Sequence, residues 1–505
     1  MTTPQHPAGQ FLGIDIPGPH LDDETRSYLE RYRFGGVCLF RKNVQSREQV
    51  ARLVRDIREV LGPQAWISID QEGGAVLRTE DLPAAPSAMA LGAVDDPALA
   101  EAVGNAVGRG LVSMGVNWDY APCLDVNIDP RNPVIGDRSF GGDPHRVAEL
   151  GLAWARGLQR AGVIATAKHF PGHGDTYLDS HLALPRVDKP RTMLERVELY
   201  PFRKAVEAGI PAIMTAHIVY SQLDPLNPAT LSKTILTGLL REEWGFGGVI
   251  VTDSMGMKAI ADNFPDGQAA VRSVQAGADI VLALGSWETK LRQAEAVAKA
   301  VETGELSGPR VEESLARLQR LVQRFPGTPR VYPAEAERAD FALMEEAARR
   351  SITTYGPVRL PRPTDSVLLV APQSTVGENV YESVPATQNL ARHLAARFPK
   401  LLLAAYAREN PESELPELKK KVAEADFLLL ATTARRPLTE AEIGFAQSLF
   451  SLGKPALHLA IWNPYHVMTL RQPAFITYGF REPSLLALAQ NLAGEPAPGA
   501  LPVEH

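Results

Sequence analysis

The feature that most constrains this chain is a regular alternation of short apolar runs with longer helix-like stretches over residues 9–285. This alternation is typical of repeated βα units around a parallel sheet. Eight β-branched-rich runs qualify as strands: residues 9–16, 35–40, 65–70, 116–126, 163–170, 212–220, 248–255 and 278–285. Eight such units predict a (β/α)8 TIM barrel, whose usual length is about 250 residues.

A second domain is expected after the barrel, because 505 residues exceed the length at which a single core usually stops growing. Helix-like stretches at 310–325 and 336–352 flank a proline-containing segment. We therefore divide the chain into a barrel domain (1–325), a linker (326–340) and a C-terminal domain (341–505).

The C-terminal domain repeats the alternation on a smaller scale. Its helical patterns include residues 388–398 and 440–453, and its apolar runs are 366–372, 401–407, 426–434, 455–463 and 474–480. These patterns predict a smaller three-layer α/β sandwich with a mainly parallel sheet. The tail GEPAPGALPVEH, from Gly494 onwards, is expected to be disordered.

Composition and charge exclude several classes of function. With 45% hydrophobic and 22% charged residues the chain is globular, and a net charge of −7 argues against nucleic acid as a partner. No apolar run approaches the roughly 18 residues that span a bilayer, and the N-terminus lacks a signal-peptide pattern, so we expect a cytoplasmic protein without a membrane partner. Cys38 and Cys123 lie in apolar runs and are expected to be buried thiols.

Polar residues close several of the apolar runs, where the carboxyl ends of barrel strands would form an active-site mouth. The richest segment, KHFPGHGDTYLDSH at residues 168–181, follows the fifth run and must be a loop. Its histidines raise the question of a metal, but their spacing is irregular and no helical zinc pattern is present, so we expect no metal or other cofactor. Asp179 and His181 instead suggest an acid/base pair, with a simple loop turn as the alternative.

Two other segments place ionisable groups at the same mouth. Asp253 closes the seventh run, where it is either catalytic or a cap of the following helix. Asp70 ends the third run and Arg78 follows beyond a Gly-Gly turn, while Arg138 lies in the loop after the fourth run. These charges suit a ligand rich in hydroxyl groups, although structural ion pairs are the alternative for both arginines.

Taken together, KHFPGHGDTYLDSH, SIDQEGG with Arg78, GDRSFGGD and VTDSMGM resemble glycoside hydrolase family 3, in particular its β-N-acetylglucosaminidase branch. The resemblance covers about the first 325 residues, in the order of the family. It implies that Asp253 is the nucleophile that forms a covalent glycosyl-enzyme, and that His181 is the acid/base, with Asp179 as its partner. It further implies that N-acetylglucosamine is bound by Asp70, Arg78, Arg138, Lys168 and His169.

The expected activity is therefore retaining release of terminal N-acetylglucosamine from glycosides derived from cell wall or chitin. A β-glucosidase or β-xylosidase of the same family is the nearest alternative, but such enzymes take their acid/base from the second domain. A phosphorylase is a further alternative, because a histidine tolerates incoming phosphate better than a carboxylate does. A sugar-binding protein without activity is the alternative outside enzymes.

Overall fold

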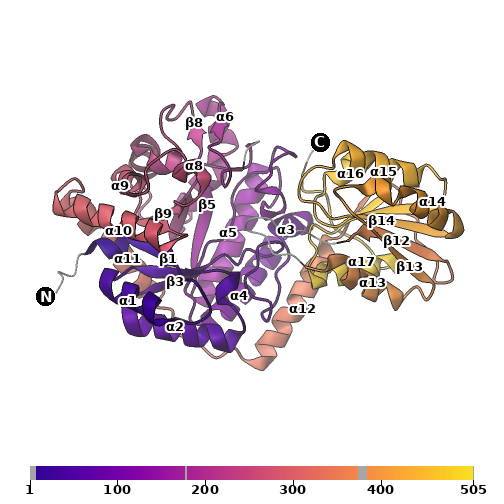
Figure 1. Ribbon diagram of the computed structural model, residues 1–505, viewed down its shortest axis with the longest axis horizontal. Helices are drawn as coiled ribbons and strands as arrows, with labels where there is room; N and C mark the ends of the chain where they lie inside the picture. The colour runs from indigo at the N-terminus through magenta and orange to yellow at the C-terminus, as the bar shows by residue number, and fades with distance from the viewer. Residues whose placement is uncertain (1–6, 177–178, 374–383, 504–505) are drawn as a thin grey trace.

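A computed structural model describes residues 7–176, 179–373 and 384–503, and it confirms the predicted barrel (Figure 1). Parallel strands close in the order β1-β10-β9-β7-β5-β4-β3-β2. Each predicted run supplies one of them: β1 (Leu12–Asp15), β2 (Gly36–Leu39), β3 (Trp66–Ile69), β4 (Trp118–Asp119), β5 (Ile164–Phe170), β7 (Ala212–Thr215), β9 (Val249–Ser254) and β10 (Ile280–Ala283). Two short strands form a separate sheet, β6 (Arg186–Val187) and β8 (Val219–Tyr220).

Helices surround the barrel because each carries an apolar face at helical spacing. In α2 the residues Val50, Leu53, Val54 and Ile57 are buried, and the Ser46 hydroxyl caps the first turn by accepting from the amide of Gln49. The helices of this domain are α1 (Asp23–Tyr32), α2 (Arg47–Leu61), α3 (Ala88–Val94), α4 (Pro97–Ser113), α5 (Pro144–Ala161), α6 (Arg191–Arg196), α7 (Leu199–Glu207), a π-helix (Thr234–Glu243), α8 (Lys258–Ala261), α9 (Asp266–Ala276), α10 (Trp287–Glu302) and α11 (Gly308–Arg324). None of the described helices is long and apolar enough to cross a bilayer.

The second domain contains a sheet in the order β11-β16-β15-β14-β12-β13. Its strands are β11 (Thr353–Tyr355), β12 (Val367–Pro372), β13 (Leu401–Tyr406), β14 (Phe427–Thr432), β15 (Ala456–Ala460) and β16 (Ala474–Ile476). The helices are α12 (Ala334–Ser351), α13 (Ala386–Ala395), α14 (Leu415–Glu424), α15 (Glu440–Phe450), α16 (His466–Leu470) and α17 (Glu482–Leu492). The sheet is parallel as predicted, except for β11, which pairs antiparallel with β16. No apolar run in the sequence had predicted β11.

The two domains pack closely, with α3 and α12 between them (Figure 1). The Ser87 hydroxyl, which caps α3, donates to the carbonyl of Tyr478 at 2.7 Å. Asn127 donates to the Tyr465 hydroxyl at 2.9 Å. Because Ser87 and Asn127 belong to the loops after β3 and β4, the second domain supports the same end of the barrel that carries the candidate site.

Helix α12, Ala334–Ser351, lies close to the helical stretch expected at 336–352. The C-terminal tail differs from expectation. The tail is ordered up to Val503: the amide of Ala500 donates to the carbonyl of Ala93 at 2.9 Å, and the carbonyl of Pro502 accepts from the amide of Gly142 at 3.0 Å. Val503 is buried. The expected disorder is therefore wrong for residues 494–503, because contacts with the barrel supply the order that the local sequence lacks.

Candidate active site

The candidate residues gather at the carboxyl ends of the barrel strands. Asp70 directly follows β3, Lys168 and His169 lie in β5, and Asp253 lies in β9. Arg138 ends a short 3-10 helix (Gly136–Arg138) in the loop after β4. Parallel strands in a barrel place these ends around one mouth, so residues far apart in sequence become neighbours.

A buried network of charges joins the residues on one side of the mouth. The Lys168 ammonium contacts Asp70 at 2.8 Å and Glu72 at 2.6 Å. Glu72 also accepts two hydrogen bonds of 2.8 Å from Arg138. Arg78 lies 3.7 Å from the second oxygen of Asp70. Asp70 is the most exposed of these side chains, at 18%, so its carboxylate faces the mouth while the others support it.

The turn after Asp70 is what allows Arg78 to return to it. Gly73 and Gly74 adopt φ values of 103° and 56°, a region that favours glycine, and a Cβ on Gly73 would meet the carbonyl of Pro86 at 2.4 Å. Beyond this turn, the Arg78 amide donates to the Gln71 side chain at 3.0 Å.

Ion pairing keeps this network charged. Burial alone would raise the pKa of Glu72, but Arg138 and Lys168 outweigh it and hold that pKa well below its usual range. For Lys168, burial opposes the charge, and Asp70 and Glu72 reverse the effect and raise the pKa of the ammonium. Three cations and two carboxylates therefore meet in one small volume.

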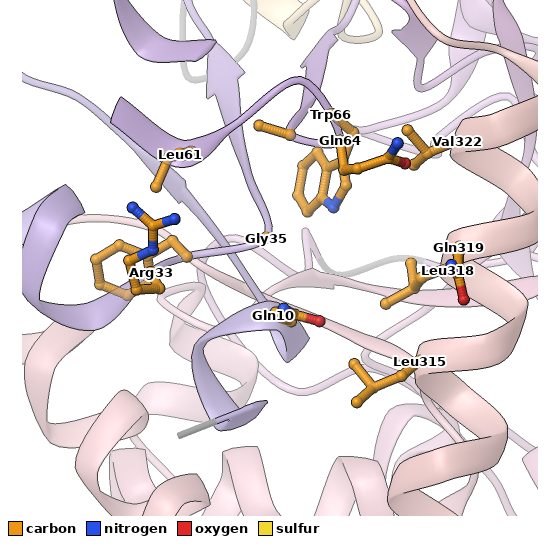
Figure 2. A pocket seen from close by; sticks show the side chains of 12 residues that line it. Gln10, Arg33, Gly35, Leu61, Gln64, Trp66, Leu315, Leu318, Gln319 and Val322 are labelled. Atoms are coloured by element: carbon orange, nitrogen blue, oxygen red, sulfur yellow. The ribbon is translucent and has the colours of Figure 1, made fainter. Parts of the chain in front are cut away.

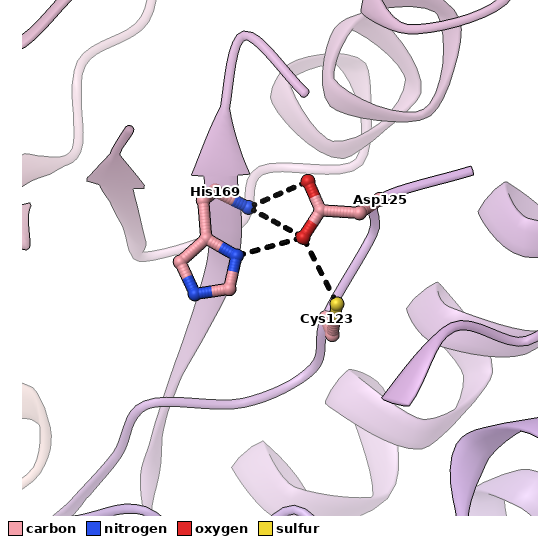
Figure 3. A group of neighbouring side chains, drawn as sticks. All are labelled: Cys123, Asp125 and His169. Atoms are coloured by element: carbon pink, nitrogen blue, oxygen red, sulfur yellow. Dashed lines mark hydrogen bonds and ion pairs between the residues drawn. The ribbon is translucent and has the colours of Figure 1, made fainter. Parts of the chain in front are cut away.

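His169 is oriented by Asp125 (Figure 3). The Asp125 carboxylate accepts from Nδ1 of His169 at 2.7 Å, from its amide at 3.1 Å, and from the Cys123 thiol at 3.0 Å. Nε2 of His169 points to Arg138, at 3.3 Å. These contacts fix the imidazole between Asp125 and Arg138.

Cys123, Asp125 and His169 are close enough together to be considered as a metal site. The contacts that they make are hydrogen bonds, with the thiol and the imidazole both directed at the carboxylate (Figure 3). Burial raises the pKa of the Cys123 thiol well above its ordinary value, whereas a metal needs the thiolate. The donor set therefore fits a support for His169 better than a metal centre.

Asp253 lies among imidazoles. Burial opposes its ionisation, but His169, His217 and His181, together with the amide of Ser254 at 2.7 Å, lower the pKa of its carboxyl. His217 in turn contacts the carbonyl of Ser254 through Nε2 at 2.9 Å. Burial lowers the pKa of His217, so its neutral ring donates there and fixes the backbone beside Asp253. The result is an ionised carboxylate at the mouth.

Asp179 and His181 form the expected pair. Nδ1 of His181 lies 2.7 Å from the Asp179 carboxylate, which also accepts from the His181 amide at 2.8 Å. Burial would raise the pKa of Asp179, but the bond to His181 lowers it. The His181 side chain is 25% exposed and that of Asp179 is 6% exposed, so a buried carboxylate orients a partly exposed ring.

Sequence reasoning missed three residues that hold this site together: Glu72, Asp125 and His217. Glu72 was inside the quoted segment SIDQEGG, and a charged residue beside a Gly-Gly turn was the available signal. Asp125 and His217 were visible as polar strand ends. Their partners were not, because these lie on other strands.

A cavity of about 440 Å³ lies at the opposite end of the barrel (Figure 2). Its lining includes Gln10, Gly35 and Ala65, which precede β1, β2 and β3, together with Leu318 and Val322 of α11. None of the candidate residues lines it. In a TIM barrel this end contributes to stability rather than to chemistry.

Known proteins resemble this chain in sequence and in fold. Residues 7–321 match the N-terminal domain of glycosyl hydrolase family 3. A β-hexosaminidase A from Pseudoalteromonas piscicida is 37% identical over 337 residues, which cover 61% of this chain and 56% of that protein. A β-hexosaminidase from Alkalilimnicola ehrlichii is 40% identical over 279 residues, which cover 54% of this chain and 79% of that protein.

The likeness extends over both domains in a solved structure. A family 3 β-N-acetylglucosaminidase from a Paenibacillus species superimposes with a TM-score of 0.93 and 34% identity, covering 100% of this chain and 99% of that one. With the Pseudoalteromonas relative, by contrast, this chain aligns over little more than half of that relative's length.

Proposed function

The chain belongs to glycosyl hydrolase family 3, and on that premise we propose that it is a retaining exo-β-N-acetylglucosaminidase. It would release terminal N-acetylglucosamine through a covalent glycosyl-enzyme. The observation that carries the proposal is the 2.7 Å contact between His181 and Asp179 on the loop after β5, at the mouth that also holds the ionised Asp253. The naming of its relatives as β-hexosaminidases supports the same substrate class.

In the first step, a carboxylate oxygen of Asp253 attacks the anomeric carbon while the bond to the leaving oxygen breaks. His181 gives that oxygen a proton, and the carboxylate of Asp179 stabilises the protonated ring before transfer. In the second step, His181 takes a proton from water, whose oxygen attacks the anomeric carbon and releases Asp253. The net change is hydrolysis with retained configuration, and no step needs a metal.

The charge network beside Asp253 is suited to hold the sugar. Asp70, partly exposed and fixed by Lys168, accepts hydrogen bonds from ring hydroxyls. Arg78 and Arg138 supply donors for the hydroxyl and acetamido oxygens, and His169 completes the set of residues around the sugar. Because their own contacts already fix these side chains, little ordering is left for binding to impose.

The source of the sugar and the place of action stay predictions. Cell-wall fragments are the expected substrates in a cytoplasm, and chitin fragments are the alternative.

The direct test compares nitrophenyl β-N-acetylglucosaminide with nitrophenyl β-glucoside, each with and without phosphate. We expect turnover of the first at a kcat/KM at least about 100-fold higher, because the site would be built around the acetamido group. Preference for the glucoside would contradict the proposed substrate. Release of sugar 1-phosphate, in place of the free sugar, would identify a phosphorylase.

A further inference from the structure

Ser180, the residue between Asp179 and His181, is only 1% exposed and is held from two sides. Its hydroxyl lies 2.8 Å from Nε2 of His173. Its backbone carbonyl accepts from the amide of Ala259 at 3.3 Å. Neither contact is needed for the pair formed by Asp179 and His181, which is complete without Ser180.

The contact with His173 links Ser180 to the side of the mouth where we propose that the sugar binds. The amide of His173 donates to Asp125 at 2.6 Å, and Asp125 is the carboxylate that orients His169. The carbonyl of His173 accepts from Asn132 at 2.8 Å. His173 is thus fixed at its backbone before its ring contacts Ser180.

The other hydrogen bonds of His173 show which partner donates in its contact with Ser180. Burial lowers the pKa of His173 to about 4, so its ring is neutral at ordinary pH. The hydroxyl of Thr176 is directed to the carbonyl of His173 at 3.3 Å, so it accepts from Nδ1 at 2.9 Å. Nε2 then carries no proton and accepts from the Ser180 hydroxyl.

The second contact ties Ser180 to the segment that follows the proposed nucleophile. Ala259 lies in α8, which follows Asp253 by a short turn. In that turn the carbonyl of Ser254 accepts from the amide of Met257 at 3.1 Å and from His217 at 2.9 Å. The backbone of Ser180 is therefore set relative to Asp253, and its side chain relative to His169.

We propose that Ser180, held by His173, is a positioning residue that places the His181 ring for proton transfer at the sugar bound to Asp253. The inference rests on the function proposed above. Without the hydroxyl of Ser180, the Asp179–His181 bond remains, but the segment that carries it loses its bond to the ring of His173. The His181 ring is then less often where the leaving oxygen needs its proton.

The test compares Ser180→Ala with wild type on two substrates. N,N'-diacetylchitobiose has a poor leaving group that needs the proton, whereas 2,4-dinitrophenyl N-acetyl-β-glucosaminide does not. We expect kcat/KM for chitobiose to fall about 10-fold to 100-fold, the scale of a misplaced catalytic group, and that for the dinitrophenyl glycoside by less than about threefold. Ser221→Ala is the matched control, because Ser221 donates to Asp188 on an exposed edge and should leave both values unchanged.

A double-mutant cycle with His173→Asn tests whether Ser180 acts through His173. If Ser180 acts through His173, adding Ser180→Ala to His173→Asn should lower kcat/KM for chitobiose by less than about twofold more. Multiplying effects, or equal losses with both substrates in a folded Ser180→Ala protein, would overturn the proposal. Should His173→Asn fail to fold, the substrate ratio in Ser180→Ala decides alone.

Wild-type activity distinguishes a failure of the proposed function from a failure of the role proposed for Ser180. A wild type that turns over neither substrate would overturn the proposed function. An active wild type whose preference between the substrates is unchanged by Ser180→Ala would overturn only the role of Ser180.

Discussion

The carboxylate of Glu72 binds the guanidinium of Arg138 through two hydrogen bonds of 2.8 Å each, with both side chains almost fully buried. The same carboxylate contacts Lys168 at 2.6 Å. Glu72 therefore neutralises two of the cations that we assign to sugar binding, and it joins the loops after β3 and β4 to strand β5.

Replacing Glu72 by Gln should lower the free energy of unfolding by about 3 kcal/mol, because two buried cations lose their shared counter-ion. Urea unfolding measures this. Glu80→Gln is the matched control, since Glu80 pairs with Arg41 on the surface and should cost less than about 1 kcal/mol. A Glu72→Gln protein as stable as the control would show that Glu72 is not the support described.

The pH dependence of this loss has a defined sign. The pKa of Glu72 is lowered in the folded protein, so its contribution is present above the unfolded pKa of about 4.3 and is lost as the pH falls below that value. The stability difference between wild type and Glu72→Gln should therefore be largest near pH 7 and smaller near pH 3.5.

Asp253→Asn should abolish turnover without loss of fold, because it removes the attacking charge and keeps the shape. A 2-deoxy-2-fluoro glycoside should label Asp253 in the wild type, as peptide mapping would show. Asp262→Asn, on the exposed end of α8, is the control and should retain activity. A label on another residue, or an inverted first product, would contradict the double displacement.

His181→Ala should hurt substrates with poor leaving groups most, by about 10² to 10⁴ in the glycosylation step. Since the second step also needs the base, a burst of nitrophenol followed by slow steady turnover is expected from a nitrophenyl glycoside. Asp179→Ala should show a milder form, because the imidazole remains. His20→Ala, at an exposed histidine, is the control. Equal losses for good and poor leaving groups would assign His181 to binding the sugar.

Ser87→Ala should destabilise the protein through its domain contact. It removes a helix cap and a bond to Tyr478, a loss of about 2 kcal/mol in all. Ser46→Ala removes the cap of α2, with no described bond across the domains, and should cost about 1 kcal/mol. Thermal unfolding would measure both, and kcat/KM should be unchanged. Equal losses of stability in Ser87→Ala and Ser46→Ala would show that the bond from Ser87 to Tyr478 contributes no measurable stability.

Activity should survive exhaustive chelation with EDTA, and Cys123→Ala should change kcat/KM by less than about threefold, because the thiol supports His169 without bearing charge. Loss of activity with EDTA, recovered by a divalent ion, would require a metal in the site.

The sequence by itself determined the barrel and the strand-end positions of the candidate residues. Buried parallel strands must be apolar, and βα repetition shows in the order of such runs, so all eight strands were locatable. Strand-end polar residues were likewise recognisable, since charge is costly within a strand. Asp179 and His181 are separated by one residue, so their contact was within the reach of local reasoning.

Only the tertiary structure decided which charges meet. Lys168 and Asp70 are 98 residues apart, and Arg138 and Glu72 are 66 apart, so no local periodicity encodes either pair. Barrel closure brings them together. The tail near Pro502 and strand β11 were likewise not predictable from local sequence, because both form hydrogen bonds with backbone groups far away in the chain. Ser180 shows the limit most clearly. Its neighbours in sequence, Asp179 and His181, suggested an acid/base pair, whereas its contacts with His173 and Ala259 are visible only in the structure.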